Sequence, residues 1–105
     1  MPKRKLETLT EQMYFVLLVL KRELCGVEIT ERVAEITSQR IQLGPGTLYA
    51  ILAQFEEEGI IRQTKIEGRK RSYIITEVGD RLLNNELLRL QKMILETNHY
   101  LNTQI

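Results

Sequence analysis

The stretch LGPGTLYAILAQFEEEG, residues 43–59, decides the fold of this chain. Pro45 suits the first turn of a helix, because the N–H that it lacks would have no partner there. Apolar residues then recur with the i, i+3, i+4, i+7 spacing of one buried helix face. Gly59 is the residue type that ends such a helix in the left-handed conformation. We therefore predict a helix that begins at Pro45 and buries Leu48, Ile51, Leu52 and Phe55.

Two further helices are expected before this stretch. Thr8 and Glu11 form a capping-box pattern, which predicts a first helix that begins near Leu9 and continues until Gly26 breaks it. One face of this helix holds Leu9, Met13, Val16, Leu17, Leu20 and Leu24, and Tyr14, Phe15, Leu18 and Val19 occupy much of the rest. Because a helix so apolar on all sides needs several neighbours, a second subunit is implied. The second helix is expected over residues 28–38, with Ile29, Val33 and Ile36 facing inward.

A hairpin and a long helix are expected after the deciding stretch. Ile60–Ile66 and Ser72–Thr76 have the pattern of strands, and Glu67–Lys70 that of the turn between them. Thr76 can cap a fourth helix, because its hydroxyl can accept a hydrogen bond from the first turn. Steps of four and three along this helix form a heptad seam of Leu83, Leu87, Leu90, Ile94, Thr97 and Leu101.

This order of elements predicts a mainly α (α+β) protein, a winged helix-turn-helix with a long C-terminal dimerisation helix. Residues 1–76 would form the winged helix-turn-helix DNA-binding domain and residues 77–105 the dimerisation helix, in one compact unit. The second helix of such a motif enters the major groove. The core stripe of the predicted third helix leaves Thr47, Tyr49, Ala50, Ala53 and Gln54 outside.

Charge distribution supports a nucleic-acid surface on the hairpin. The net charge is only +1, but residues 62–71 hold Arg62, Lys65, Arg69, Lys70 and Arg71 against one anion, Glu67. Arg69 and Lys70 at the tip could reach a neighbouring minor groove or its phosphates. The alternative is a winged helix used as a protein-interaction module or antirepressor, without sequence-specific DNA binding. A general DNA-coating protein would carry a much larger positive charge.

Three stretches carry a family resemblance: LGPGTLY at residues 43–49, GRKRSYIITEVG at 68–79 and CGVEI at 25–29, where Val27 replaces a customary Tyr. They resemble the PadR family of transcriptional regulators, in its small subfamily with a short C-terminal helix. The resemblance implies a dimeric repressor of operator DNA, with Gly46, Thr47 and Tyr49 at the matching DNA-facing positions. A two-fold dimer would read an inverted repeat in double-stranded DNA. Helical spacing and charge add Ala50 and Gln54 on the third helix and Arg69 and Lys70 on the wing to the expected DNA-binding residues.

The resemblance also implies a small hydrophobic effector held between the long helices, where several family members have a Trp. This chain has no Trp, and Leu90 takes that position. Tyr14, Phe15, Leu18, Leu90, Met93 and Ile94 could line a smaller pocket or could simply pack the dimer core. The expected dimer interface itself contains Leu83, Leu87, Leu90, Ile94 and Leu101.

Other functions find little support in the sequence. A single histidine, His99, and a single cysteine, Cys25, argue against a familiar catalytic triad and are too few for the usual zinc ligand sets. We therefore expect no enzyme activity, no cofactor and no metal. A lone cysteine, the absence of a membrane-length apolar run and the absence of a signal-peptide pattern favour the cytoplasm of a prokaryote.

Overall fold

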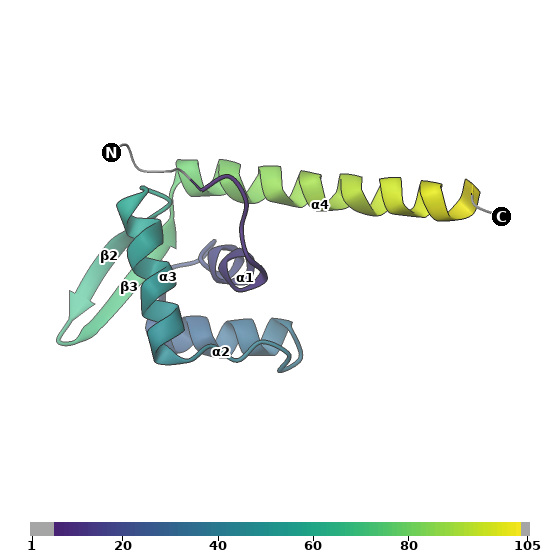
Figure 1. Ribbon diagram of the computed structural model, residues 1–105. Coiled ribbons are helices and arrows are strands. Elements are labelled where there is room, and N and C mark those ends of the chain that lie inside the picture. Colours follow the sequence, from purple (N-terminus) through teal and green to yellow (C-terminus); the bar gives the residue numbers. More distant parts are fainter. Residues whose placement is uncertain (1–5, 104–105) are drawn as a thin grey trace.

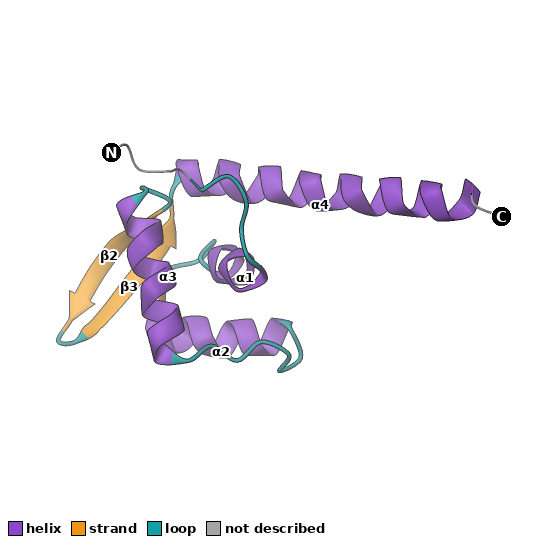
Figure 2. Ribbon diagram, in the orientation of Figure 1, coloured by secondary structure: helices purple, strands orange, loops and turns teal. Residues whose placement is uncertain are grey.

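The computed structural model describes residues 6–103. Four helices and a small sheet follow one another along the chain (Figures 1 and 2). The elements are α1 (Glu11–Val19), β1 (Leu24–Cys25), α2 (Gly26–Ile36), α3 (Pro45–Glu57), β2 (Ile61–Glu67), β3 (Lys70–Ile75) and α4 (Glu77–Thr103). This is the predicted winged helix-turn-helix with a long last helix.

The core of the domain lies between α1, α2, α3 and the sheet. The predicted stripe of α3 is confirmed, since Leu48, Ile51, Leu52 and Phe55 are all buried. Pro45 is the first residue of α3, and Gly59 beyond its end has a φ of 71°. These local signals place the recognition helix of the motif correctly.

The first helix is shorter than predicted. It is capped by Thr10, whose hydroxyl accepts a hydrogen bond from the Met13 N–H at 3.1 Å, and not by Thr8. It ends at Val19, five residues before Leu24, which lies in β1 instead. Leu24 is buried as predicted but in a strand and not in the helix, so its burial alone does not show where the helix ends.

The second helix also begins earlier than predicted. Gly26 is its first residue and does not break a preceding helix, and Cys25 occupies the N-cap position. Glu28 completes the cap, since its carboxylate accepts a hydrogen bond from the Cys25 N–H at 2.9 Å. Ile29 and Val33 are buried as expected, but Ile36 in the last turn is 46% exposed, so the prediction that it faces inward was wrong.

The wing is a hairpin of β2 and β3, and it projects from the helices (Figure 2). Both strands extend farther toward the tip than predicted, which leaves Gly68 and Arg69 as the turn. Gly68 has a φ of 63°, a conformation that a tight hairpin turn requires. β1 adds a third antiparallel strand beside β3, giving the order β1-β3-β2. This strand was not predicted.

The last helix begins against the wing and then leaves the domain (Figure 1). Thr76 caps it, because the Thr76 hydroxyl accepts a hydrogen bond from the Gly79 N–H at 3.2 Å. The same hydroxyl lies within hydrogen-bond distance of the Gly59 and Ile60 carbonyls, at 2.6 and 2.9 Å, which fixes the helix to the segment that follows α3. Leu83 is buried in the core, whereas beyond Glu86 every described residue of α4 is exposed.

Residues 6–10 tie α3 to α4. The Leu6 N–H donates to the carboxylate of Glu58 at 2.6 Å, and the Leu9 N–H donates to that of Glu86 at 2.7 Å. Glu86 is only 2% exposed and also accepts two hydrogen bonds from the Arg89 guanidinium. The hydrogen bonds from this guanidinium lower the pKa of Glu86, and this effect outweighs burial, which raises the pKa. The carboxylate therefore stays charged.

Candidate DNA-binding surface

The exposed face of α3 carries the side chains that were predicted to contact DNA. Gly46, Thr47, Tyr49 and Ala50 are all exposed, and Tyr49 is 59% accessible. Ala53 is exposed on the same helix. Small residues beside two hydroxyl donors leave room for a close approach of the helix to a polyanion. The structure therefore brings these predicted residues together on one surface.

Gln54 differs from the other predicted residues of α3. It is half-buried, and its side-chain amide donates to the Glu58 carboxylate at 3.3 Å. Glu56, Glu57 and Glu58 occupy the same end of the helix. An amide that is already paired beside carboxylates is poorly placed to meet DNA. We therefore expect the DNA contacts of α3 to come from its first two turns, at the end near Thr47.

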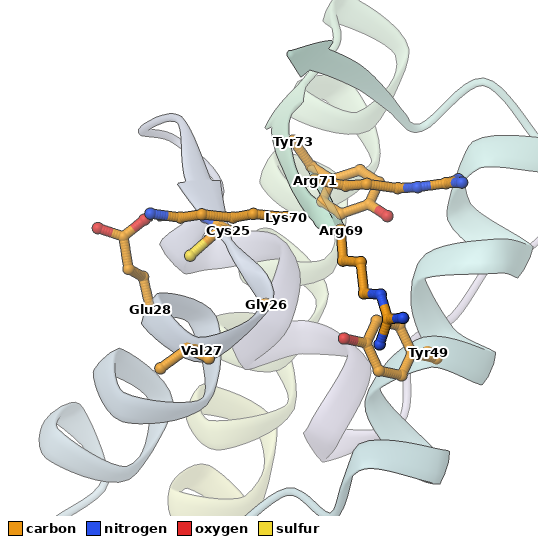
Figure 3. Close-up of a pocket in the computed structure, with 9 residues that line it drawn as sticks. All are labelled: Cys25, Gly26, Val27, Glu28, Tyr49, Arg69, Lys70, Arg71 and Tyr73. Carbon is orange, nitrogen blue, oxygen red and sulfur yellow. Dashed lines mark hydrogen bonds between the residues drawn. The ribbon is translucent and has the colours of Figure 1, made fainter. Parts of the chain in front are cut away.

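The tip of the wing holds three successive cations, Arg69, Lys70 and Arg71, and all are exposed. Their side chains point in different directions (Figure 3). Arg69 points toward Tyr49 of α3, whereas Lys70 points toward Glu28 of α2. None of the ion pairs within the described part of the chain involves Arg69 or Arg71. Both guanidinium groups are thus available to an anion.

A groove separates the wing from α3 and has a volume of about 780 Å³. Its walls are Tyr49 on one side and the wing on the other, and the start of α2 lines the space between them (Figure 3). The lining residues are Cys25, Gly26, Val27, Glu28, Tyr49, Arg69, Lys70, Arg71 and Tyr73. Of these, the sequence had identified only Tyr49, Arg69 and Lys70 as binding residues.

The pairing of β1 with β3 builds the floor of this groove. Leu24 lies opposite Tyr73 and Cys25 opposite Ser72, so the start of α2 is held beside the wing. A β-carbon on Gly26 would lie 3.5 Å from the Tyr49 hydroxyl, which indicates how closely α2 and α3 approach here. No local pattern marks a two-residue strand, and for this reason the sequence did not reveal the groove.

Charges in the groove are unevenly distributed. The hydrogen bond from the Cys25 backbone lowers the pKa of Glu28, and the nearby Lys70 lowers it further, so Glu28 is an anion at neutral pH. Burial raises the pKa of Tyr73, and Glu56 raises it further, so this phenol stays neutral. The lining therefore combines three cations and one carboxylate with the rings of Tyr49 and Tyr73. This net positive charge is what an anionic ligand requires.

The residues predicted to bind an effector lie on two elements. Tyr14, Phe15 and Leu18 of α1 are half-buried, and the Tyr14 and Phe15 rings pack edge to face at 5.3 Å. Leu90, Met93 and Ile94 are exposed on α4, beyond the part of that helix that covers the domain. A single chain therefore does not enclose a site between all six residues.

No group of three or more His, Cys, Asp or Glu side chains in residues 6–103 could hold a metal ion. No helix in the same range is long and apolar enough to cross a membrane.

Comparison with known proteins shows which protein family the chain resembles. The model of the Transcriptional regulator PadR-like family matches residues 16–85. The chain is 30% identical over 89 residues to an uncharacterized 37.1 kDa protein in transposon TN4556 of Streptomyces fradiae. This match covers 82% of the chain but only 25% of that protein, so the chain spans about a quarter of this relative.

Solved structures share the fold. A PadR family transcriptional regulator from Eggerthella lenta superposes with a TM-score of 0.75 at 20% identity, over 88% of this chain and 82% of that one. Bacillus subtilis PadR, solved in complex with operator DNA, superposes with a TM-score of 0.62 at 29% identity, over 71% of this chain and 46% of that one. The family consists of transcriptional regulators and not of enzymes. The fold, the DNA-bound relative and the match over residues 16–85 agree, and the chain belongs to the Transcriptional regulator PadR-like family.

Proposed function

We propose that this chain is a transcriptional repressor that binds an inverted-repeat operator as a homodimer. The observation that carries the proposal is the juxtaposition of the exposed start of α3 with the cationic wing tip across one groove. In this arrangement α3 reads bases in a major groove, and Arg69 and Lys70 hold the adjacent backbone. The relative from Bacillus subtilis, solved with operator DNA, supports this use of the surface.

The proposed second subunit covers the free face of α4. Leu87, Leu90, Ile94 and Leu101 follow one stripe of this helix, and all four are exposed in the single chain. Leu83 is buried in its own protomer and is therefore not part of the seam that a partner would cover. Burying such a stripe against its symmetry mate would remove leucine and isoleucine side chains from water, at about 1.5–3 kcal/mol for each fully buried side chain.

Two further parts of the proposal concern organisation. Residues 1–76 would act as the DNA-binding domain and residues 77–105 as the dimerisation helix, in one compact unit attached through Thr76 and Glu86. A regulator of this kind acts where the chromosome lies, which in a prokaryote is the cytoplasm. A small hydrophobic effector between the two subunits would need the partner's helices to complete a site with Met93 and Ile94.

The experiment that tests the proposal is selection from randomised duplexes with purified protein at moderate salt. We expect an enriched inverted repeat, because two α3 helices related by a two-fold axis read the same bases in opposite directions. Thr47→Ala and Tyr49→Phe should weaken binding to the selected duplex. Asn85→Ala, which removes an exposed amide on α4 outside the heptad seam, should not.

The antirepressor alternative predicts a different result. A winged helix that serves only protein contacts would enrich no duplex over the starting pool. It would also bind the inverted repeat of a relative's operator and a scrambled version of it equally. Either result would refute the proposed operator recognition.

A further inference from the structure

A β-bulge interrupts the wing in the middle of β2. Gln63 lies opposite Tyr73 and Lys65 lies opposite Ser72, so Thr64 is one extra residue between two pairs. The Thr64 hydroxyl is buried and has no hydrogen-bond partner among the described residues. A single extra residue moves every later side chain of its strand to the opposite face of the sheet. The bulge therefore decides which side chains of β2 reach which face of the wing tip.

The bulge places an isoleucine instead of a lysine beside Arg71. Ile66 lies opposite Arg71, and the side chains of directly opposed residues leave a sheet on the same face. In an uninterrupted ladder that keeps the pair of Gln63 and Tyr73, Lys65 would lie opposite Arg71 instead. Ile66 is a large apolar residue, yet it is 56% exposed. The wing tip thus presents an exposed apolar side chain next to a guanidinium group.

The two faces of the wing tip differ in charge. On one face Lys65 pairs with Glu67 at 3.5 Å, and Lys70 extends toward Glu28 (Figure 3). Arg71 lies on the other face, on the side of α3 (Figure 3). None of the ion pairs in the described part of the chain involves this arginine. The face that carries free positive charge is therefore the face that carries the exposed isoleucine.

This combination matches the minor groove of DNA. Proteins that bind this groove frequently insert apolar side chains, isoleucine among them, while neighbouring cations hold the phosphates along its edges. The base pairs differ there mainly in one group, the N2 amino donor of guanine, which A·T pairs lack. An apolar side chain against that donor leaves it without a hydrogen-bond partner, which is unfavourable. Ile66 would therefore favour A·T pairs over G·C pairs.

We propose that Ile66 is a specificity-determining residue, whose side chain enters the minor groove beside each half-site and makes the affinity depend on the base pairs there. Arg71 on the same face holds the adjacent phosphates. This inference rests on the proposed function, because it requires a bound duplex. It gives the wing a role beyond the phosphate contacts of Arg69 and Lys70, which carry no sequence information.

The first experiment measures binding to three versions of the selected inverted repeat by fluorescence anisotropy at constant salt. The base pairs that adjoin each half-site are all A·T, all G·C or all inosine·C, and the half-sites are unchanged. Inosine is guanosine without the N2 amino group, so inosine·C loses only the minor-groove donor of G·C. We expect wild-type protein to bind the A·T and inosine·C duplexes about five-fold or more tighter than the G·C duplex. Equal affinity for the G·C and inosine·C duplexes would overturn the proposal.

Variants assign the preference to Ile66. Ile66→Ala should bring the ratio of the inosine·C affinity to the G·C affinity close to one. Ile66→Asn should bring it to one or below, because the amide oxygen can accept a hydrogen bond from the guanine amino group. Val78→Ala is the matched control and should keep the wild-type ratio, because Val78 is an apolar residue, 48% exposed, at the start of α4. Both positions are exposed, so the variants should keep the fold, and circular dichroism checks this.

Salt dependence separates this contact from the phosphate contacts. Ile66→Ala removes no charge, so it should weaken binding to the A·T duplex without changing the slope of log affinity against log salt concentration. An unchanged affinity ratio in Ile66→Ala, or a reduced slope, would overturn the proposal. If wild-type protein binds the inverted repeat regardless of the adjoining base pairs, this inference fails and the proposed function stands. If wild-type protein binds no duplex specifically, the proposed function fails and this inference fails with it.

Discussion

A β-carbon on Gly79 would collide with the backbone of the DNA-binding domain. It would lie 2.2 Å from the Ile60 carbonyl oxygen and 2.8 Å from a side-chain carbon of Ile75. A carbon–oxygen contact of about 3.3 Å is the usual closest approach, so the substitution Gly79→Ala requires a displacement of about 1 Å. The Ile60 carbonyl also accepts hydrogen bonds from the Thr76 N–H and hydroxyl, at 3.0 and 2.9 Å. The displacement would therefore loosen the attachment of α4 to the domain.

The size of this effect follows from three contributions. Overpacking costs about 1–3 kcal/mol, and a weakened hydrogen bond to the Ile60 carbonyl costs about 1 kcal/mol. Alanine regains at most about 1 kcal/mol of helix propensity relative to glycine. The net expectation for Gly79→Ala is a loss of about 2 kcal/mol in the free energy of unfolding. In a domain of this size that lowers Tm by roughly 10 °C.

The assay is thermal unfolding followed by circular dichroism at fixed protein concentration, since an oligomer's Tm depends on concentration. Gly46→Ala is the matched control, because a β-carbon on this helical glycine meets no atom within 4 Å. Gly46→Ala should leave Tm unchanged or raise it, whereas Gly79→Ala should lower it. Equal Tm values for the two variants would refute the close contact between α4 and Ile60.

Three further outcomes are expected. The pKa of Glu86 is lowered in the folded state, so the unfolded chain binds more protons at this carboxylate. The free energy of unfolding of the wild type should therefore fall as the pH drops below about 4.3 and through the folded pKa. Glu86→Gln should flatten this pH dependence, as measured by denaturant titrations at several pH values. Lys70→Ala should reduce the slope of log affinity for DNA against log salt concentration by about one counterion, whereas Lys92→Ala on α4 should leave the slope unchanged. Equal slopes for the two variants would show that Lys70 of the wing does not contact DNA. Replacing Leu87 and Ile94 together with Glu should yield folded monomers or unfolded chains in sedimentation, because unpaired charges would be buried at the seam; a fully folded dimer would contradict that interface.

The recognition helix and the wing were predictable because their signals are local. Proline at the first position, an apolar stripe at helical spacing and glycine after the end all lie within residues 45–59. The hairpin likewise depends on a turn at Gly68 and on strand-forming residues beside it. Each signal acts within one or two turns of chain, so the tertiary structure had little opportunity to override it.

The start of the domain was predicted less well because its structure depends on distant partners. β1 exists because Leu24 and Cys25 pair with β3, almost fifty residues later. Glu86 of α4 is buried where the Leu9 N–H, 77 residues away in the sequence, donates to it. Neither long-range contact has a pattern in the local sequence.

The binding surface was half predictable for the same reason. Thr47 and Tyr49 follow from helical spacing, and Arg69 and Lys70 follow from charge at a turn. Arg71 was expected only as part of the cationic cluster and Tyr73 was not expected to line a groove, because that groove requires the start of α2 beside β3. The sequence also did not predict that Gln54 is half-buried, where its side-chain amide donates to the Glu58 carboxylate.

The central claim is that two copies of this chain use α3 and the wing to read a symmetric operator. Hydroxyl-radical footprinting of wild-type protein on the selected duplex tests it most directly, with Ala50→Glu as the comparison. Ala50 is exposed on α3, so the added carboxylate should spare the fold but repel phosphates. We predict two equally protected half-sites about one helical turn apart, roughly 34–36 Å, and loss of both in Ala50→Glu. A single asymmetric footprint, or unchanged protection by Ala50→Glu, would contradict the account.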